Sequence, residues 1–141
     1  MTGFADGEDA NDFFQIQSFD AKTKSAHVHG RPILRGDVVI LRHLATNTWL
    51  HSHEHKSPLS ANQEVSAYVG KDEGNFWEVQ NDFVRGQPVR LKHVTTDKFL
   101  AMNGNRYSNP IPNQFEVAAQ SAPGPNTVWF TTNGIYFEET A

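Results

Sequence analysis

The sequence contains no cysteine, which excludes disulfide bonds and thiolate metal sites. It has no apolar run long enough to span a bilayer. Basic residues are fewer than acidic ones, with 12 Lys and Arg compared with 16 Asp and Glu. No block of like charge occurs. Phosphate-binding surfaces need clustered basic side chains, so the composition argues against nucleic acid and against an inositol polyphosphate ligand.

A helical period is also missing, since no stretch keeps helical apolar spacing over three turns. What is present is a repeat of about 50 residues, a period typical of arrays of similar units. Residues 36–43 recur as 86–93, residues 62–65 as 113–117 and residues 76–77 as 128–129. Each unit is predicted to hold four short strands: 38–43, 49–53, 64–69 and 76–80, then 89–94, 99–103, 116–120 and 128–132.

The two copies indicate which side chains point inward, because strand side chains alternate between faces. Leu41 is matched by Leu91, whereas Arg42 is matched by Lys92. The matched apolar positions are predicted to face the core, and the charged positions to face water. Further matched apolar pairs extend this predicted core: Val39 with Val89, Leu50 with Leu100, Val65 with Val117 and Trp77 with Trp129.

A third, partial copy lies at the start, where residues 13–17 resemble 76–80. Too few residues precede it to form the first two strands of a unit. We therefore expect an incomplete first repeat, with unpaired backbone groups on the strands that begin at Val38 and Val128. Self-association through this incomplete barrel edge is a further expectation.

Residues 41–53, which read Leu-Arg-His-x-x-Thr-x-x-x-Leu-His-Ser-His, resemble the MIR motif. Residues 57–68, Ser-Pro-Leu-Ser-Ala-Asn-Gln-Glu-Val-Ser-Ala-Tyr, are similar to the second repeat of the stromal cell-derived factor 2 family. Residues 105–117 resemble its third repeat, and the likeness covers nearly the whole chain.

This resemblance implies an all-β fold, a β-trefoil of four-stranded repeats with the first repeat incomplete. Residues 1–141 would then be one MIR domain, with a remnant of repeat one and a linker at 1–34, repeat two at 35–85, and repeat three with a tail at 86–141. The signal peptide and the terminal retention signal of the family are absent from this sequence. A shortened chain would explain the missing N-terminal parts.

The resemblance also implies a chaperone cofactor of the endoplasmic reticulum (ER) lumen, without catalytic residues or cofactors. Its partners would be an ER J-domain cochaperone, BiP and unfolded client polypeptides. Two alternatives stay open, a lumenal MIR domain of a protein O-mannosyltransferase and a lectin-like trefoil that binds glycans.

His51, His53 and His55 alternate along one predicted strand, a spacing that could present three imidazoles to zinc. We expect His55 to leave the strand before Pro58 and see no carboxylate partners, so no metal site is predicted. The equivalent positions in the next unit are Ala101 and Asn103, so the scaffold does not require histidine there. The candidate binding surface predicted from these patterns comprises Trp49, His51, His53, His55 and Tyr107.

Two other histidines, His43 and His93, recur at matched inward positions and are interpreted as hydrogen-bonded, partly buried residues. No catalytic pair is predicted among the acidic residues. They are interpreted as loop acids: Asp72, Glu73, Asp97 and Glu116.

Overall fold

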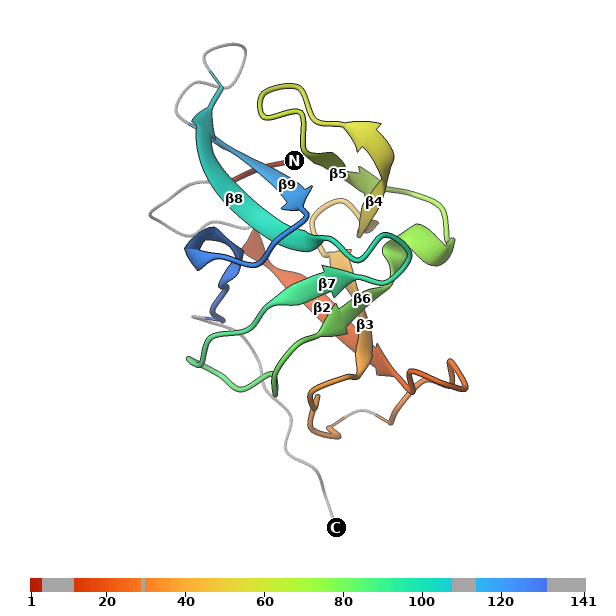
Figure 1. The fold of residues 1–141 in the computed structure, drawn as a ribbon. Coiled ribbons are helices and arrows are strands. Elements are labelled where there is room, and N and C mark those ends of the chain that lie inside the picture. Colours follow the sequence, from red (N-terminus) through yellow and green to blue (C-terminus); the bar gives the residue numbers. More distant parts are fainter. Residues whose placement is uncertain (4–11, 29, 108–113, 132–141) are drawn as a thin grey trace.

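The computed structural model describes residues 1–3, 12–28, 30–107 and 114–131, and their regular structure is almost entirely β (Figure 1). This confirms the all-β expectation. The strands are β1 (Thr2–Gly3), β2 (Phe14–Phe19), β3 (Val38–His43), β4 (Thr48–Lys56), β5 (Gln63–Tyr68), β6 (Trp77–Val79), β7 (Leu91–His93), β8 (Phe99–Arg106) and β9 (Phe115–Gln120). Two short 3-10 helices, η2 (Glu73–Asn75) and η3 (Pro125–Thr127), each precede a tryptophan by two residues.

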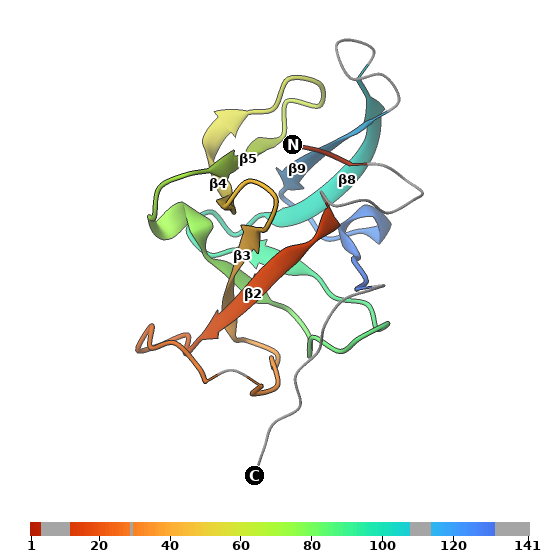
Figure 2. The ribbon, with the colours of Figure 1, turned by 180° about the vertical axis from the view of Figure 1, so that it is seen from behind.

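Seven of these strands close into a ring in the order β9, β5, β4, β3, β6, β7, β8 and back to β9. Every pairing in the ring is antiparallel. The two remaining strands lie beside it, β2 against β3 and the two-residue β1 against β9. Figure 2 shows β2 running across the outside of the barrel.

The expected β-trefoil of four-stranded repeats is therefore wrong. The described strands form one continuous, closed antiparallel barrel. β2 is an additional strand, which pairs with β3 along all six of its residues. Strands of different predicted units pair directly, for example β5 with β9 through Gln63 and Ala119. A repeat in the sequence shows which segments are alike, but strand neighbours are chosen by tertiary contacts, so the architecture did not follow from the repeat.

The two related segments nevertheless repeat individual contacts. The indole Nε1–H of Trp77 donates to the carbonyl of Leu50 over 3.2 Å, and that of Trp129 donates to the carbonyl of Leu100 over 2.9 Å. These four residues were matched in the sequence. Each tryptophan therefore packs against the core while its polar group is satisfied by the strand it covers.

The turns after β3 and β7 are also alike. His43 Nδ1 lies 2.7 Å from the hydroxyl of Thr46, and His93 Nδ1 lies 2.8 Å from that of Thr96. His93 is fully buried and His43 is half-buried. The interpretation of both as hydrogen-bonded histidines is confirmed, and the expected partial burial holds for His43, whereas His93 is buried completely.

The core fills the inside of the barrel, and the inward register predicted from the repeat is confirmed. Leu41 and Leu91 are buried, whereas Arg42 and Lys92 are partly exposed. The buried cluster consists of Val39, Leu41, Leu50, Val65, Trp77, Val79, Val89, Leu91, Leu100, Val117 and Ala119. Burial of this apolar surface is the main favourable contribution to folding.

The expected open edge at Val38 is also wrong. β2 pairs with β3 over six residues, from Phe14 opposite His43 to Phe19 opposite Val38. Near the other expected edge, Trp129 forms an antiparallel bridge with Val89. Residue 132, the end of the strand expected at 128–132, lies outside the described residues.

Candidate binding surface

The outer side of β4 carries a row of rings. Trp49, His51, His53 and His55 alternate with inward residues such as Leu50. We call His51, His53 and His55 the histidine row. Adjacent rings in the row have centroids 5.2 Å and 4.3 Å apart. β4 continues to Lys56, so the expectation that His55 leaves the strand is wrong.

β5 supplies the partners of this row. Tyr68 lies opposite Trp49 in the strand register, and its ring packs on His51 with a centroid distance of 4.4 Å. His53 Nε2 lies 3.3 Å from Oε1 of Glu64, and both side chains are more than one-third exposed. A contact this exposed to water contributes little to stability, and both side chains are accessible to a ligand.

His51 itself is not accessible, because residues 70–75 cover it. We call residues 70–75, which include η2, the 70–75 turn. His51 Nδ1 lies 2.9 Å from Oδ1 of Asn75 and 3.4 Å from Oδ1 of Asp72. The Asn75 amide nitrogen donates to the carbonyl of Gly70, so its oxygen faces His51 and accepts a hydrogen bond from Nδ1–H. His51 anchors the turn and does not form part of the exposed surface.

His93 holds the same turn from β7. Its Nε2 lies 2.9 Å from the carbonyl oxygen of Gly74, and a carbonyl can only accept, so Nε2 carries the proton. Burial lowers the pKa of His93, and positive charge on His51 or His53 lowers it further. The bond to Gly74 and the carboxylate of Asp72 act in the opposite direction.

The two aromatic candidates lie in different places. Trp49 is half-buried, and Nζ of Lys71 lies 5.5 Å from the centre of its ring. Tyr107 follows β8, where its amide donates to the carbonyl of Gln114. Burial and the nearby carboxylates of Glu116 and Glu64 raise the pKa of Tyr107. Among the described residues, no hydrogen bond or ring contact joins Tyr107 to the histidine row.

No group of three or more His, Asp or Glu within the described ranges is arranged to hold a metal ion. Two ring nitrogens of the row instead contact protein side chains: Nδ1 of His51 contacts Asn75, and Nε2 of His53 contacts Glu64. The absence of a zinc site remains a prediction for titration.

Glu116, interpreted from the sequence as a loop acid, is instead a buried residue of β9. It lies in β9 with none of its surface exposed, and its carboxylate accepts hydrogen bonds from Ser57, Ser60 and Asn103 and from the Leu59 amide. Burial alone would raise the pKa of Glu116, but these hydrogen bonds outweigh it and lower the pKa. The repeat in the sequence did not predict that Glu116 is buried.

A contact between Ser18 and His27 has the composition of a nucleophile and its base, but its surroundings do not suit that role. The Ser18 hydroxyl lies 3.0 Å from His27 Nδ1, and Nη1 of Arg31 lies 3.0 Å from the same nitrogen. Arg31 in turn pairs with Asp37 over 3.0 Å. A guanidinium only donates, so it occupies the lone pair with which a general base would take a proton.

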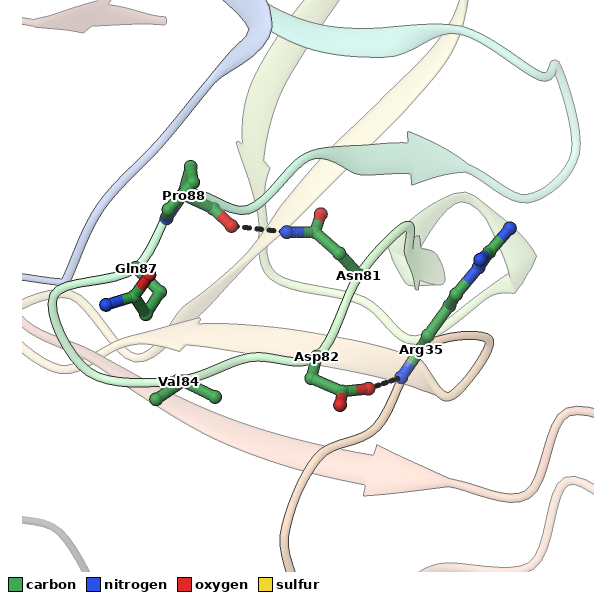
Figure 3. Close-up of a pocket in the computed structure, with 6 residues that line it drawn as sticks. All are labelled: Arg35, Asn81, Asp82, Val84, Gln87 and Pro88. Carbon is green, nitrogen blue, oxygen red and sulfur yellow. Dashed lines mark hydrogen bonds between the residues drawn. The ribbon is translucent and has the colours of Figure 1, made fainter.

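A shallow pocket of about 400 Å³ lies away from the row, between the loops before β3 and after β6 (Figure 3). Its polar groups serve the loops themselves. Asp82 accepts a hydrogen bond from the Arg35 amide over 2.8 Å, and the Asn81 side chain donates to the carbonyl of Pro88. The pocket is therefore a junction of two loops, in which the Asp82 and Asn81 side chains are engaged by hydrogen bonds between the loop segments.

The chain resembles known proteins along nearly its whole length. No family model matches it. Stromal cell-derived factor 2 of Mus musculus, however, is 37% identical over 144 residues, covering 98% of this chain and 67% of that protein. This chain belongs to the stromal cell-derived factor 2 family. Members of the family carry MIR domains, so the resemblance stated from the sequence is confirmed.

Solved structures agree with the family assignment. The SDF2-like protein from Arabidopsis thaliana is 28% identical, with a TM-score of 0.86 over 97% of this chain and 78% of that chain. A protein O-mannosyltransferase complex of S. cerevisiae, solved with its sugar donor bound, contains a similar region. It is 23% identical with a TM-score of 0.75, over 90% of this chain and 20% of that chain, which shows a shared fold alone. No helix in the described part of the SDF2-family chain is long and apolar enough to cross a membrane.

Proposed function

We propose that this SDF2-family chain is a non-catalytic binding module that acts as a chaperone cofactor in the ER lumen. In this role it would work with a J-domain cochaperone and BiP and would contact unfolded client polypeptides. The observation that carries the proposal is the likeness to stromal cell-derived factor 2, which extends over 98% of the chain.

The outer face of β4 and β5 suits the binding of polypeptide. Trp49 and Tyr68 lie opposite one another on neighbouring strands, and Val69, directly after β5, is 79% exposed. His53 and Glu64 add hydrogen-bonding groups beside these apolar surfaces. Aromatic residues bordered by polar groups are typical of surfaces that bind other proteins.

Aggregation of a heat-unfolded or reduced client, followed by light scattering, tests the proposal. We expect the chain to suppress aggregation, and to do so better with its J-domain partner. Trp49→Ala and Tyr68→Ala should weaken suppression, whereas Phe130→Ala, another exposed aromatic change, should not. Equal client aggregation with and without the chain, alone and with the partner, would contradict the proposal.

A second candidate function is an accessory domain that binds glycans or acceptors for a protein O-mannosyltransferase. The fold shared with the S. cerevisiae complex supports it. Aromatic rings beside Asn and His can also stack on a sugar. Pull-down from ER lumen separates the two, because recovery of mannosyltransferase subunits or free glycans, without BiP or the J-domain protein, would favour this alternative.

A further inference from the structure

The 70–75 turn is held from two sides by histidines of different strands. His51 of β4 donates to Asn75, and His93 of β7 donates to the carbonyl of Gly74. The contact between His51 and Gly74 is tight, because a Cβ on Gly74 would lie 2.3 Å from Cε1 of His51. The 70–75 turn also covers both imidazole rings, so that His51 is 4% exposed and His93 is 0% exposed.

In the part of the chain that the structure describes, the corresponding turn of the related segment forms without histidine. In η3, the Thr127 amide donates to the carbonyl of Gly124, and the Thr127 hydroxyl donates to the same oxygen. Where His51 stands on β4, the equivalent residue of β8 is Ala101. Arg90, which stays charged across the pH range of proteins, also donates to the Thr127 hydroxyl and the Gly124 carbonyl. The two histidines therefore give the 70–75 turn contacts that can titrate, whereas the described contacts of η3 do not.

We propose that protonation of His93 releases the 70–75 turn, so that mildly acidic conditions open it and reshape the binding surface on β4 and β5. Burial disfavours the charged form of an imidazole. When the pH falls, protonation of the ring therefore favours a state in which water reaches it. Lifting the turn would expose His93 and His51 and would move Lys71 away from the ring of Trp49. As a regulation of that surface, this inference rests on the proposed function.

The charged groups around His93 act in both directions. From β4, positive charge on His51 and His53 disfavours a proton on His93, while Asp72 of the turn favours it. Lys92, the neighbour of His93 in β7, lies 3.8 Å from carboxylate oxygens of both Glu78 and Asp97. Burial is the largest influence and lowers the pKa of His93. A proton is therefore bound more readily when the turn is open, and a fall in pH favours opening.

Amide hydrogen exchange followed by NMR between pH 7.5 and pH 4.5 tests this without any partner. The Asn75 and Phe76 amides donate to the carbonyls of Asp72 and Glu73. After correction for intrinsic exchange, the protection of these two amides should decrease as the pH is lowered. For a single titrating proton, the protection can decrease by at most about tenfold per pH unit. The Thr127 amide of the histidine-free turn serves as the internal control and should not share the change. Equal loss in both turns would mean global destabilisation and would overturn the proposal.

Two substitutions sharpen the test. His93→Gln keeps a donor for the Gly74 carbonyl but cannot titrate, so protection of the 70–75 turn should become independent of pH. Gly74→Ala should displace the turn already at pH 7.5, which keeps the test decisive if His93→Gln fails to fold. His55→Gln, at the exposed end of the row, is the matched control and should leave the pH response unchanged. A flat wild-type profile would refute the release of the turn, whereas failure of the proposed function would appear only in the client assay.

Discussion

The side-chain amide of Asn103 donates to the carboxylate of Glu116 over 2.9 Å and so joins β8 to β9 at a fully buried acid. The same carboxylate accepts the Leu59 amide and the hydroxyls of Ser57 and Ser60, in the loop between β4 and β5. Two hairpins distant in sequence are thereby held together by one charge. The groups that donate to the Glu116 carboxylate are all neutral, so its charge is stabilised by hydrogen bonds and not by an opposite charge.

Glu116→Gln should destabilise the protein by about 1–3 kcal/mol, the range for losing hydrogen bonds to a buried charged group. The new amide would turn donors toward the Leu59 amide and the hydroxyls, which already donate. Chemical denaturation measures the effect. Glu54→Gln makes the same change on the exposed side of β4 and should alter stability far less.

Glu116 should also make the protein sensitive to acid. Its pKa in the folded chain is lowered from the ordinary value of 4.5, so its contribution is fully present above pH 4.5 and is lost as the pH falls through the folded value. Unfolding free energies measured from pH 6 to pH 2 should therefore fall less steeply for Glu116→Gln than for the wild type. Parallel curves for the two proteins would contradict this assignment.

Leu41→Ala and Leu91→Ala should each cost about 2–5 kcal/mol, because both remove buried methyl groups from the barrel core. Leu44→Ala removes the same atoms at a side chain that is 49% exposed and is the matched control. Urea denaturation of the three variants compares them directly. A loss at Leu44 as large as at Leu41 would show that the inward register is misassigned.

β2 should protect the edge of β3. Deletion of residues 1–26 removes the six-residue pairing with β3 and exposes backbone donors and acceptors that invite pairing with another chain. We expect a lower melting temperature and concentration-dependent association by light scattering. The chain that retains β2 should show neither. A monomeric, equally stable deletion variant would mean that the β2 pairing contributes nothing.

Zinc should not bind stoichiometrically to the histidine row. His51 Nδ1 is engaged by Asn75, and the row has no third ligand arranged around a common point in the described residues. Titration against a colorimetric zinc competitor measures this. A submicromolar site that disappears in His53→Ala would disprove the interpretation of the row as hydrogen-bonding and packing residues.

The candidate surface was only partly predictable. Alternation along one strand correctly placed Trp49, His53 and His55 on the outer side of β4. The same alternation could not reveal that the 70–75 turn folds back over His51, since that contact joins residues more than twenty positions apart. Tyr107 was grouped with the row on residue type alone, and it lies instead beyond β8.

The sequence by itself determined the β character, the inward positions such as Leu41 and Leu91, the matched tryptophans, and the family. These features depend on local alternation and on residue types that recur, so they can be read along the chain. Only the tertiary structure decided that the strands close into one ring, that β2 covers β3, and that Glu116 and His51 are buried. The physical reason is that side-chain alternation specifies the two faces of a strand, whereas its neighbours and its burial depend on segments that meet only after folding.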